Sequence, residues 1–311
     1  MKISVFLTGL FRDALGASLA LFKVMIPIVV LVKLLKEFGL IAPLAAPLGP
    51  VMEAVGLPAG LGLVWATAML SNIYSALVVF QAMLPQLGLF TQAQATVLAV
   101  LMLIAHNLLV EGQVTKSCGV SFLGQNALRA GGALACAWLL HRVLQAGGWL
   151  QDPALMLWNP PAEDGSLVSW AVGEARNLGW IFVIIFSLMG LMRVLNLLGL
   201  TRLMERLLTP LLKLMGIGPT AATVTVIGMT MGLTYGGGLI IHETRAGHLS
   251  RRDVFASVSL MSLSHALIED TLLMTLIGAS AWGTLLARLV FSLVVTAILS
   301  RVAVRRVAVP S

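Results

Sequence analysis

The feature that most constrains this chain is a series of apolar segments, each near the length needed to cross a lipid bilayer. A spanning helix needs about 20 predominantly apolar residues. Six segments approach or reach that length: Leu15–Leu35, Ala93–Val110, Ala127–Leu144, Leu178–Leu195, Val254–Leu273 and Leu285–Ile298. Two more, 61–84 and 221–241, are apolar with polar residues and glycines at their centres. The mean hydropathy of +0.97 is typical of polytopic membrane proteins. These segments predict an all-α protein that crosses the membrane several times.

The low charge, the few cysteines and the absence of known catalytic motifs limit the functions open to the chain. Only 11% of the residues are charged, and the formal net charge is +7. Membrane proteins concentrate Lys and Arg in cytoplasmic loops, so this charge does not call for a nucleic-acid partner. Cys118 and Cys136 are too few and too widely spaced for a disulfide framework or a zinc site. The motifs GxxxxGK[ST], GxSxG and HExxH do not occur, which argues against a nucleotide-driven step and against an enzyme.

The two halves of the sequence resemble each other at an offset of about 160 residues. The two tyrosines of the chain, Tyr74 and Tyr235, hold equivalent places, and so do His106 and His265. Matches on such residue types, in order and with small gaps, indicate a tandem duplication. We therefore predict a first membrane repeat over residues 1–146, a linker over 147–170 and a second membrane repeat over 171–311.

The basic residues predict that the two repeats are inverted relative to each other. Segment 242–253 holds three arginines, and so does segment 301–306; the positive-inside rule places both segments, and both chain termini, in the cytoplasm. The equivalent of 242–253 in the first half, 85–92, carries no charge, as expected of an outside loop. The linker contains three tryptophans and no Lys or Arg, which fits the non-cytoplasmic face. Parallel repeats with four crossings each are the alternative.

Inverted repeats require an odd number of crossings. We therefore expect about three spanning helices plus one re-entrant hairpin in each repeat, with the hairpins at 61–84 and 221–241. The hairpin residues that could hold a solute are Ser71, Asn72, Tyr74, Thr230, Thr234, Tyr235, Gly236 and Gly237. The alternative role of the glycines is close helix packing, because Gly228, Gly232 and Gly236 have GxxxG spacing.

Two histidines lie deep inside apolar segments, where an ionisable side chain costs about 2.5–3.5 kcal/mol on insertion scales. His106 and His265 each follow a predicted helix N-cap, Thr91 and Ser250, by 15 residues, or about 22 Å of helix. If a two-fold axis in the membrane plane relates the repeats, the two histidines converge near the centre. Otherwise, each histidine bonds a nearby carbonyl or hydroxyl and holds helices together.

Carboxylates follow both histidines. His265 and Glu269 are four residues apart and would share a face of one helix. Glu111 follows His106 by five residues and would point about 140° away on a straight helix. We therefore expect either a helix break near Gly112, with an unwound end after His106, or a separate role for the carboxylate.

The repeated unit is similar to a known family. It consists of a basic amphipathic lead-in, a polar hairpin rich in Gly, Ser, Thr and Asn, and a broken helix with a buried acid. This pattern resembles the nucleoside-recognition, or Gate, domain family over 31–143 and 191–302. That family includes parts of concentrative nucleoside transporters, the membrane domain of the bacterial ferrous-iron transporter, and spore maturation membrane proteins. The Gln-Thr-Glu hairpin motif of the nucleoside transporters is absent, so the resemblance implies transport more than it implies a substrate.

The sequence leaves three functions open for a protein of a bacterial-type cytoplasmic (inner) membrane, with the lipid bilayer as its surroundings. The first is a transporter or facilitator of a small polar solute, nucleoside-like by the resemblance, coupled to H⁺ or Na⁺ and compatible with a homo-oligomer. Besides the hairpin groups, with Tyr74 and Tyr235 stacking on a ring, its site would include His106, Asn107, Glu111, His265, Glu269 and Asp270.

The second function is transport of a divalent cation such as zinc, iron or manganese, since imidazole with carboxylate suits these metals. The metal ligands would be His106, Glu111, His265, Glu269 and Asp270. The third is a non-transporting membrane partner that assembles with or regulates other proteins. In that case the buried polar groups only hold helices together.

Overall fold

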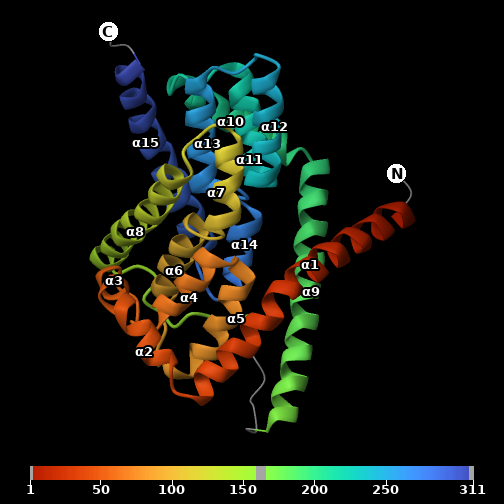
Figure 1. Cartoon of the computed structure of the whole chain (residues 1–311), viewed down its shortest axis with the longest axis vertical. Helices are drawn as coiled ribbons and strands as arrows, with labels where there is room; N and C mark the ends of the chain where they lie inside the picture. The colour runs from red at the N-terminus through yellow and green to blue at the C-terminus, as the bar shows by residue number, and fades with distance from the viewer. Residues whose placement is uncertain (1–2, 159–165, 308–311) are drawn as a thin grey trace.

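The computed structural model describes residues 3–158 and 166–307, and the regular structure of these residues is helical throughout (Figure 1). The first half contains α1 (Ile3–Glu37), α2 (Ile41–Ala45), the 3-10 helix η1 (Ala46–Leu48), α3 (Gly49–Ala54), α4 (Leu61–Leu70), α5 (Ile73–Met83), the 3-10 helix η2 (Leu84–Gln86), α6 (Gln92–Ile104), α7 (Leu108–Ser117) and α8 (Phe122–Gly147). The second half contains α9 (Leu167–Leu197), α10 (Leu200–Leu214), α11 (Pro219–Met231), α12 (Leu233–Arg245), α13 (Arg251–Ser264), α14 (Glu269–Thr275) and α15 (Ala281–Val307). In both halves a long helix is followed by a connecting region, which is α2, η1 and α3 in the first half and α10 in the second, and then by a helix pair, a broken helix and another long helix.

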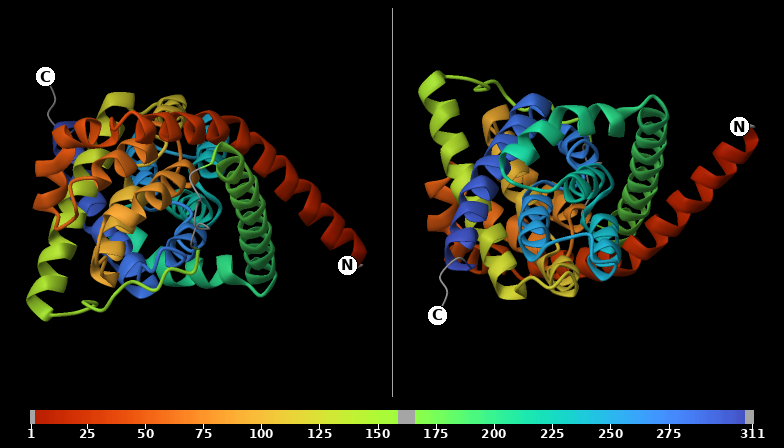
Figure 2. Two further views of the ribbon diagram at one scale, coloured as in Figure 1. Left: turned by 90° about the horizontal axis from the view of Figure 1, so that it is seen from below. Right: turned by 90° about the horizontal axis from the view of Figure 1, so that it is seen from above.

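Three of the described helices are long and apolar enough to cross a membrane, and they cover 5–37, 167–197 and 281–301. The consecutive helices α6 and α7 form a further span if counted as one helix bent by 42°. Large apolar side chains are exposed along α1 and α9, as on lipid-facing helices. These two helices pack against each other, and the N-terminal part of α1 extends beyond the rest of the molecule (Figure 2). The chain is therefore a multi-pass helical membrane protein.

The helix pairs α4–α5 and α11–α12 are helical hairpins. Each helix has 10 to 13 residues, or about 15–20 Å, too short to cross a hydrocarbon core of about 30 Å. The outer ends of α4 and α5 meet, because a Cβ on Gly60 would lie 2.6 Å from the Met83 side chain. In α11–α12 the turn is at Gly232, whose φ of 99° is readily reached only by glycine. The hairpins fall where the sequence predicts them.

The two broken helices form the centre of the molecule. Every residue is buried from Ala95 to His106 in the first and from Ala256 to His265 in the second. Both start as predicted, with a capping box at Thr91 and another at Ser250. The helices run in opposite directions, since α6–α7 rises and α13–α14 descends in Figure 1. Their breaks therefore lie side by side at mid-height.

The linker packs beside these helices. Ala154 N–H donates to the Phe90 carbonyl before α6 (2.9 Å), and Leu157 N–H donates to the Leu276 carbonyl after α14 (3.0 Å). Helix α9 begins at Leu167, so the last residues of the predicted 147–170 linker are helical. Residues 159–165 of that linker lie outside the described part.

Candidate functional site

Both histidines lie at breaks between consecutive helices. His106 stands between α6 and α7, and Asn107 has a left-handed backbone with φ 49°. His265 stands between α13 and α14, and Ala266 has φ 44°. A left-handed conformation costs a residue such as alanine about 1–2 kcal/mol, and asparagine less; such strain is concentrated at functional sites.

The position of these breaks corrects two predictions from the sequence. The first break is at His106 and not near Gly112, and α7 is regular from Leu108 to Ser117, so the predicted unwound end is wrong. His265 and Glu269 do not share a helix face, because the helix ends at Ser264 and restarts at Glu269. Residues four apart share a face only in a continuous helix, and the left-handed residue after each histidine interrupts the helix.

The backbone sets the tautomer of both rings. His106 Nδ1 lies 3.2 Å from the Met102 carbonyl oxygen, and His265 Nδ1 lies 2.9 Å from the Met261 carbonyl oxygen. A carbonyl oxygen only accepts, so each Nδ1 carries the hydrogen and donates it. In the neutral imidazole, Nε2 is then an unprotonated lone-pair donor to a cation.

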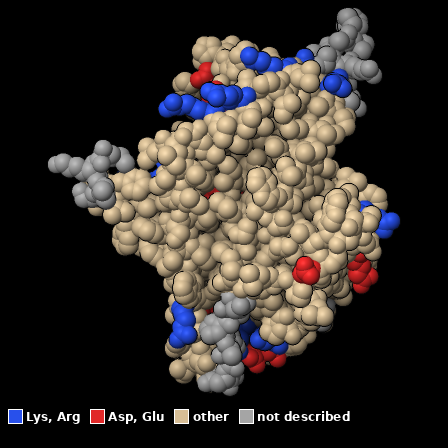
Figure 3. Space-filling model, turned by 180° about the vertical axis from the view of Figure 1, so that it is seen from behind, with Lys and Arg blue, Asp and Glu red and all other residues tan. Residues whose placement is uncertain are grey.

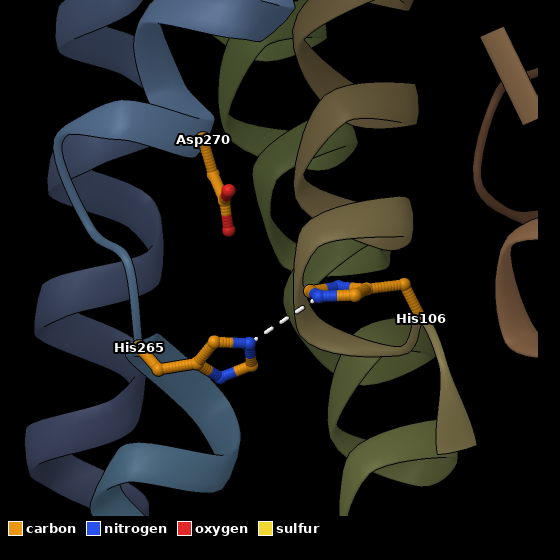
Figure 4. Close-up of side chains that lie close together, drawn as sticks. All are labelled: His106, His265 and Asp270. Carbon is orange, nitrogen blue, oxygen red and sulfur yellow. Dashed lines mark hydrogen bonds between the residues drawn. The ribbon is translucent and has the colours of Figure 1, made fainter. Parts of the chain in front are cut away.

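The two unprotonated nitrogens face each other. His106 Nε2 and His265 Nε2 are 3.3 Å apart, with both rings buried (Figure 4). Glu111 Oε1 completes a triangle, 3.4 Å from His106 Nε2 and 3.3 Å from His265 Nε2. Three lone-pair atoms so close together repel one another unless a cation lies between them. A proton on one ring, or a metal ion among the three atoms, would relieve this repulsion.

The carboxylates of α14 differ in their placement. Asp270 points toward the two rings (Figure 4), and one carboxylate oxygen lies within 4.8 Å of a nitrogen of each. Asp270 Oδ2 is buried and accepts no hydrogen bond from the described residues. Glu269 is partly buried at the start of α14. In the described part of the chain, no hydrogen bond or ion pair joins it to the triangle of His106, His265 and Glu111. The structure thus groups His106, His265, Glu111 and Asp270.

Two buried arginines support the broken ends. Arg129 of α8 donates from Nε to the Ile104 carbonyl (2.9 Å) and from Nη2 to the His106 carbonyl (2.8 Å). Its Nη1 also lies 2.6 Å from Glu111 Oε2 in an ion pair. Arg288 of α15 donates from Nη2 to the His265 carbonyl (2.9 Å). A helix end leaves its last carbonyls without intrahelical partners, and the arginines bond those carbonyls.

These two arginines were not among the site residues predicted from the sequence. Arg129 and Arg288 each follow a histidine of the pair by 23 residues and lie inside apolar segments. A lone arginine there is expensive in a membrane and indicates a buried partner. The presence of an arginine at equivalent positions of both halves is the sequence feature that indicates a shared role for Arg129 and Arg288.

The polar groups of the first hairpin mostly bond one another. Asn72 caps α5 by accepting from Ser75 N–H (2.9 Å), and its Nδ2 donates to Ser71 Oγ (3.1 Å). Tyr74 is partly buried, within electrostatic range of Glu269 and Asp270. The hairpin also contacts the break between α6 and α7, because Asn107 N–H donates to the Ala68 carbonyl near the end of α4 (2.8 Å). The first hairpin thus holds the first break in place.

The second hairpin contacts its own break in a similar way, because Leu267 N–H donates to the Met229 carbonyl (2.9 Å). Thr230 is buried and donates to carbonyls of its own helix. Thr234 is exposed, and Tyr235 lies at the surface with 52% of its area exposed. The structure does not bring these two side chains to the histidine pair.

The glycines of the second hairpin are in close packing contacts. A Cβ on Gly236 would lie 2.6 Å from Gly228 Cα, and a Cβ on Gly237 would lie 2.5 Å from Val114 Cγ1 of α7. Both distances are too short for a side chain, so these glycines let α11, α12 and α7 approach one another. These glycines therefore have the close helix-packing role expected of GxxxG spacing.

Comparison with known proteins agrees with a membrane protein. No protein family model matches the chain, and no solved structure matches it. The chain is 27% identical over 295 residues to a protein of Bacillus subtilis (strain 168) described as the uncharacterized membrane protein YvoD. The match covers 94% of this chain and 93% of that protein. The similarity therefore extends over nearly the whole membrane architecture.

Proposed function

We propose that this protein is a membrane transporter or facilitator whose central site binds a divalent metal cation, above all zinc, as its substrate. The triangle of His106 Nε2, His265 Nε2 and Glu111 Oε1 carries this proposal. Its sides measure 3.3, 3.3 and 3.4 Å. A tetrahedral zinc ion at about 2.0–2.1 Å from its N and O ligands separates each ligand pair by about 3.3–3.4 Å.

The charges around the triangle suit reversible binding. Arg129 is paired with Glu111, which weakens the attraction of that carboxylate for a cation. Transport requires an ion to enter the site and also to leave it. Asp270 points toward the two histidine rings (Figure 4), with one carboxylate oxygen within 4.8 Å of a nitrogen of each, and can supply a fourth ligand after a small movement.

The relation of the two halves supports a transport mechanism. The site takes one histidine from each half, at the breaks of helices that run in opposite directions. Both halves also have the order long helix, hairpin, broken helix and long helix. These observations support our inference of inverted repeats around a site at mid-membrane, where rocking of one repeat against the other exposes the ion to either side. The inner-membrane location with cytoplasmic termini belongs to the same proposal.

The polar-solute alternative has less support from the geometry. The hydroxyl and amide groups of the first hairpin bond one another, and Tyr235 lies at the surface. The resemblance to the Gate family remains compatible with cation transport, because that family includes the ferrous-iron transporter membrane domain.

Substitution of the histidines tests the proposal. In purified protein, calorimetry should show that His106→Gln and His265→Gln each weaken zinc binding by roughly a hundredfold, since outer partners alone contribute 10–100-fold. The double variant should be little worse than either single variant, because one site is lost only once. The matched control is His248→Gln, since His248 lies in an exposed loop and bonds Glu243.

Two further measurements separate binding from transport. Zinc binding should weaken when the solution is acidified, because protons compete with the metal ion for the lone pairs of its ligands. Proteoliposomes with wild-type protein should take up zinc, and those with either variant should not. If both variants bound and took up zinc as well as the wild-type protein does, the histidines would only hold helices together. Zinc binding without uptake by wild-type protein would contradict transport.

A further inference from the structure

Helix α10 presents three distinct faces. At about 100° per residue, its cations Arg202, Arg206 and Lys213 fall within about 40° of one another. All three are exposed. None of them forms an ion pair with another part of the described chain. This basic face is therefore available to an anion from outside the protein.

The second face of α10 is apolar and exposed. It consists of Leu203, Leu207, Leu211 and Leu214, which are 44–79% exposed. The third face packs the helix onto the molecule through Leu208 and Leu212, both of which belong to the core of the second half. Because the inner face is already buried in the protein, the exposed leucines must be covered by something else.

The basic face borders a hollow of the surface. A cavity of about 670 Å³ is lined by the three cations together with Glu205, Thr209, Pro210, Pro219 and Thr223. Glu205 accepts a hydrogen bond from Thr223 (2.9 Å), so the one acidic group of the hollow already has a partner. The hollow therefore has a net positive character.

This basic surface belongs to one end of the molecule. The Arg252 side chain donates to the Met215 carbonyl just after α10 (3.3 Å), so the arginine-rich segment 242–253 lies beside it. Figure 3 shows Lys and Arg gathered along the upper end of the surface, where these elements lie. In the first half, the corresponding segment α2–α3 contains no Lys or Arg. The basic, leucine-lined helix therefore occurs in one half alone.

We propose that α10 is a binding site for an anionic phospholipid. The phosphate of the headgroup lies in the hollow and accepts hydrogen bonds from Arg202, Arg206 and Lys213. The acyl chains run along the exposed leucine face. Guanidinium and ammonium groups are the usual partners of phosphate, and interfacial amphipathic helices combine such a basic face with an apolar one. This proposal is independent of the metal site.

Lipid-dependent thermal stability tests the site. Protein stripped of lipid in neutral detergent would be titrated with phosphatidylglycerol, phosphatidylcholine or inorganic phosphate, because a ligand bound only by the folded state raises the unfolding temperature. Each cation near an anionic lipid is worth about fivefold in affinity. We therefore expect the triple variant R202Q/R206Q/K213Q to lose phosphatidylglycerol affinity on the order of a hundredfold, and to bind phosphatidylcholine as before.

A matched control has three other exposed cations, Lys23, Lys36 and Arg142, replaced by glutamine. It should keep the wild-type preference for phosphatidylglycerol, and that preference should weaken in high salt. If the R202Q/R206Q/K213Q variant retained the preference, α10 would not be the site. If inorganic phosphate stabilised the wild-type protein as much as phosphatidylglycerol, the hollow would be a soluble-anion site and the lipid proposal would be overturned.

Discussion

Replacing Arg129 by methionine removes a side chain that serves both the helix break and the charge of the site. Arg129 is 1% exposed, bonds the carbonyls of Ile104 and His106, and pairs with Glu111. Each buried carbonyl left without a partner costs about 1–3 kcal/mol. Breaking a buried ion pair by removing one partner costs about 3–5 kcal/mol. These losses overlap because they come from one side chain, so we expect Arg129→Met to lower the free energy of unfolding by about 4 kcal/mol.

The assay is thermal unfolding of purified protein in detergent, where about 4 kcal/mol corresponds to a fall on the order of 10 °C. The double variant Arg129→Met/Glu111→Gln should be more stable than Arg129→Met alone, because it leaves no unpaired buried charge; coupling of about 1–3 kcal/mol is expected. Arg142→Gln is the control, since Arg142 is exposed on the same helix and should change stability by less than about 0.5 kcal/mol. If Arg129→Met unfolded at the same temperature as this control, the inferred role of Arg129 would be wrong.

Two other predictions concern packing and topology. Gly237→Leu should lower the yield of folded protein in size-exclusion chromatography, because its Cβ would meet Val114 Cγ1 at 2.5 Å, whereas Gly131 has no heavy atom within 4 Å and Gly131→Leu should fold normally. Equal yields would contradict the close packing of α12 on α7. Single cysteines in 85–92 and in 242–253, in a cysteine-free background, should react with impermeant reagent from opposite sides of the membrane. Reaction from the same side would favour parallel repeats.

Much of the fold could be predicted because it depends on local sequence. Membrane class follows from the apolar segments, and the starts of the central helices follow from the N-cap residues Thr91 and Ser250, which the structure confirms. The hairpin at Gly232 follows from a cluster of glycines. The meeting of His106 and His265 was expected from the repeat, and the structure places their Nε2 atoms 3.3 Å apart.

The helix breaks could not be located in the same way because they depend on distant residues. Nothing local predicts a left-handed backbone at Ala266, since alanine favours helix. The break is stabilised from outside, by Arg288 on the His265 carbonyl and by the Met229 carbonyl on Leu267 N–H. The predicted positions of Glu269 and of the two arginines were therefore wrong or missing, because continuous helices do not place these side chains at the site.

The breaks and the proposed cation site depend on each other. A helix that ends in the middle of a membrane leaves carbonyl groups with no water to bond them, so its end needs a donor such as the guanidinium of Arg129. That buried positive charge in turn needs a carboxylate, and Glu111 supplies it. Once Glu111 is held there, its second oxygen faces His106 and His265, whose Nδ1 groups are turned away to the backbone. The geometry that satisfies the broken helix thus also places three lone-pair atoms around one point, which is why the proposed site lies at the break and not elsewhere along α6 and α13.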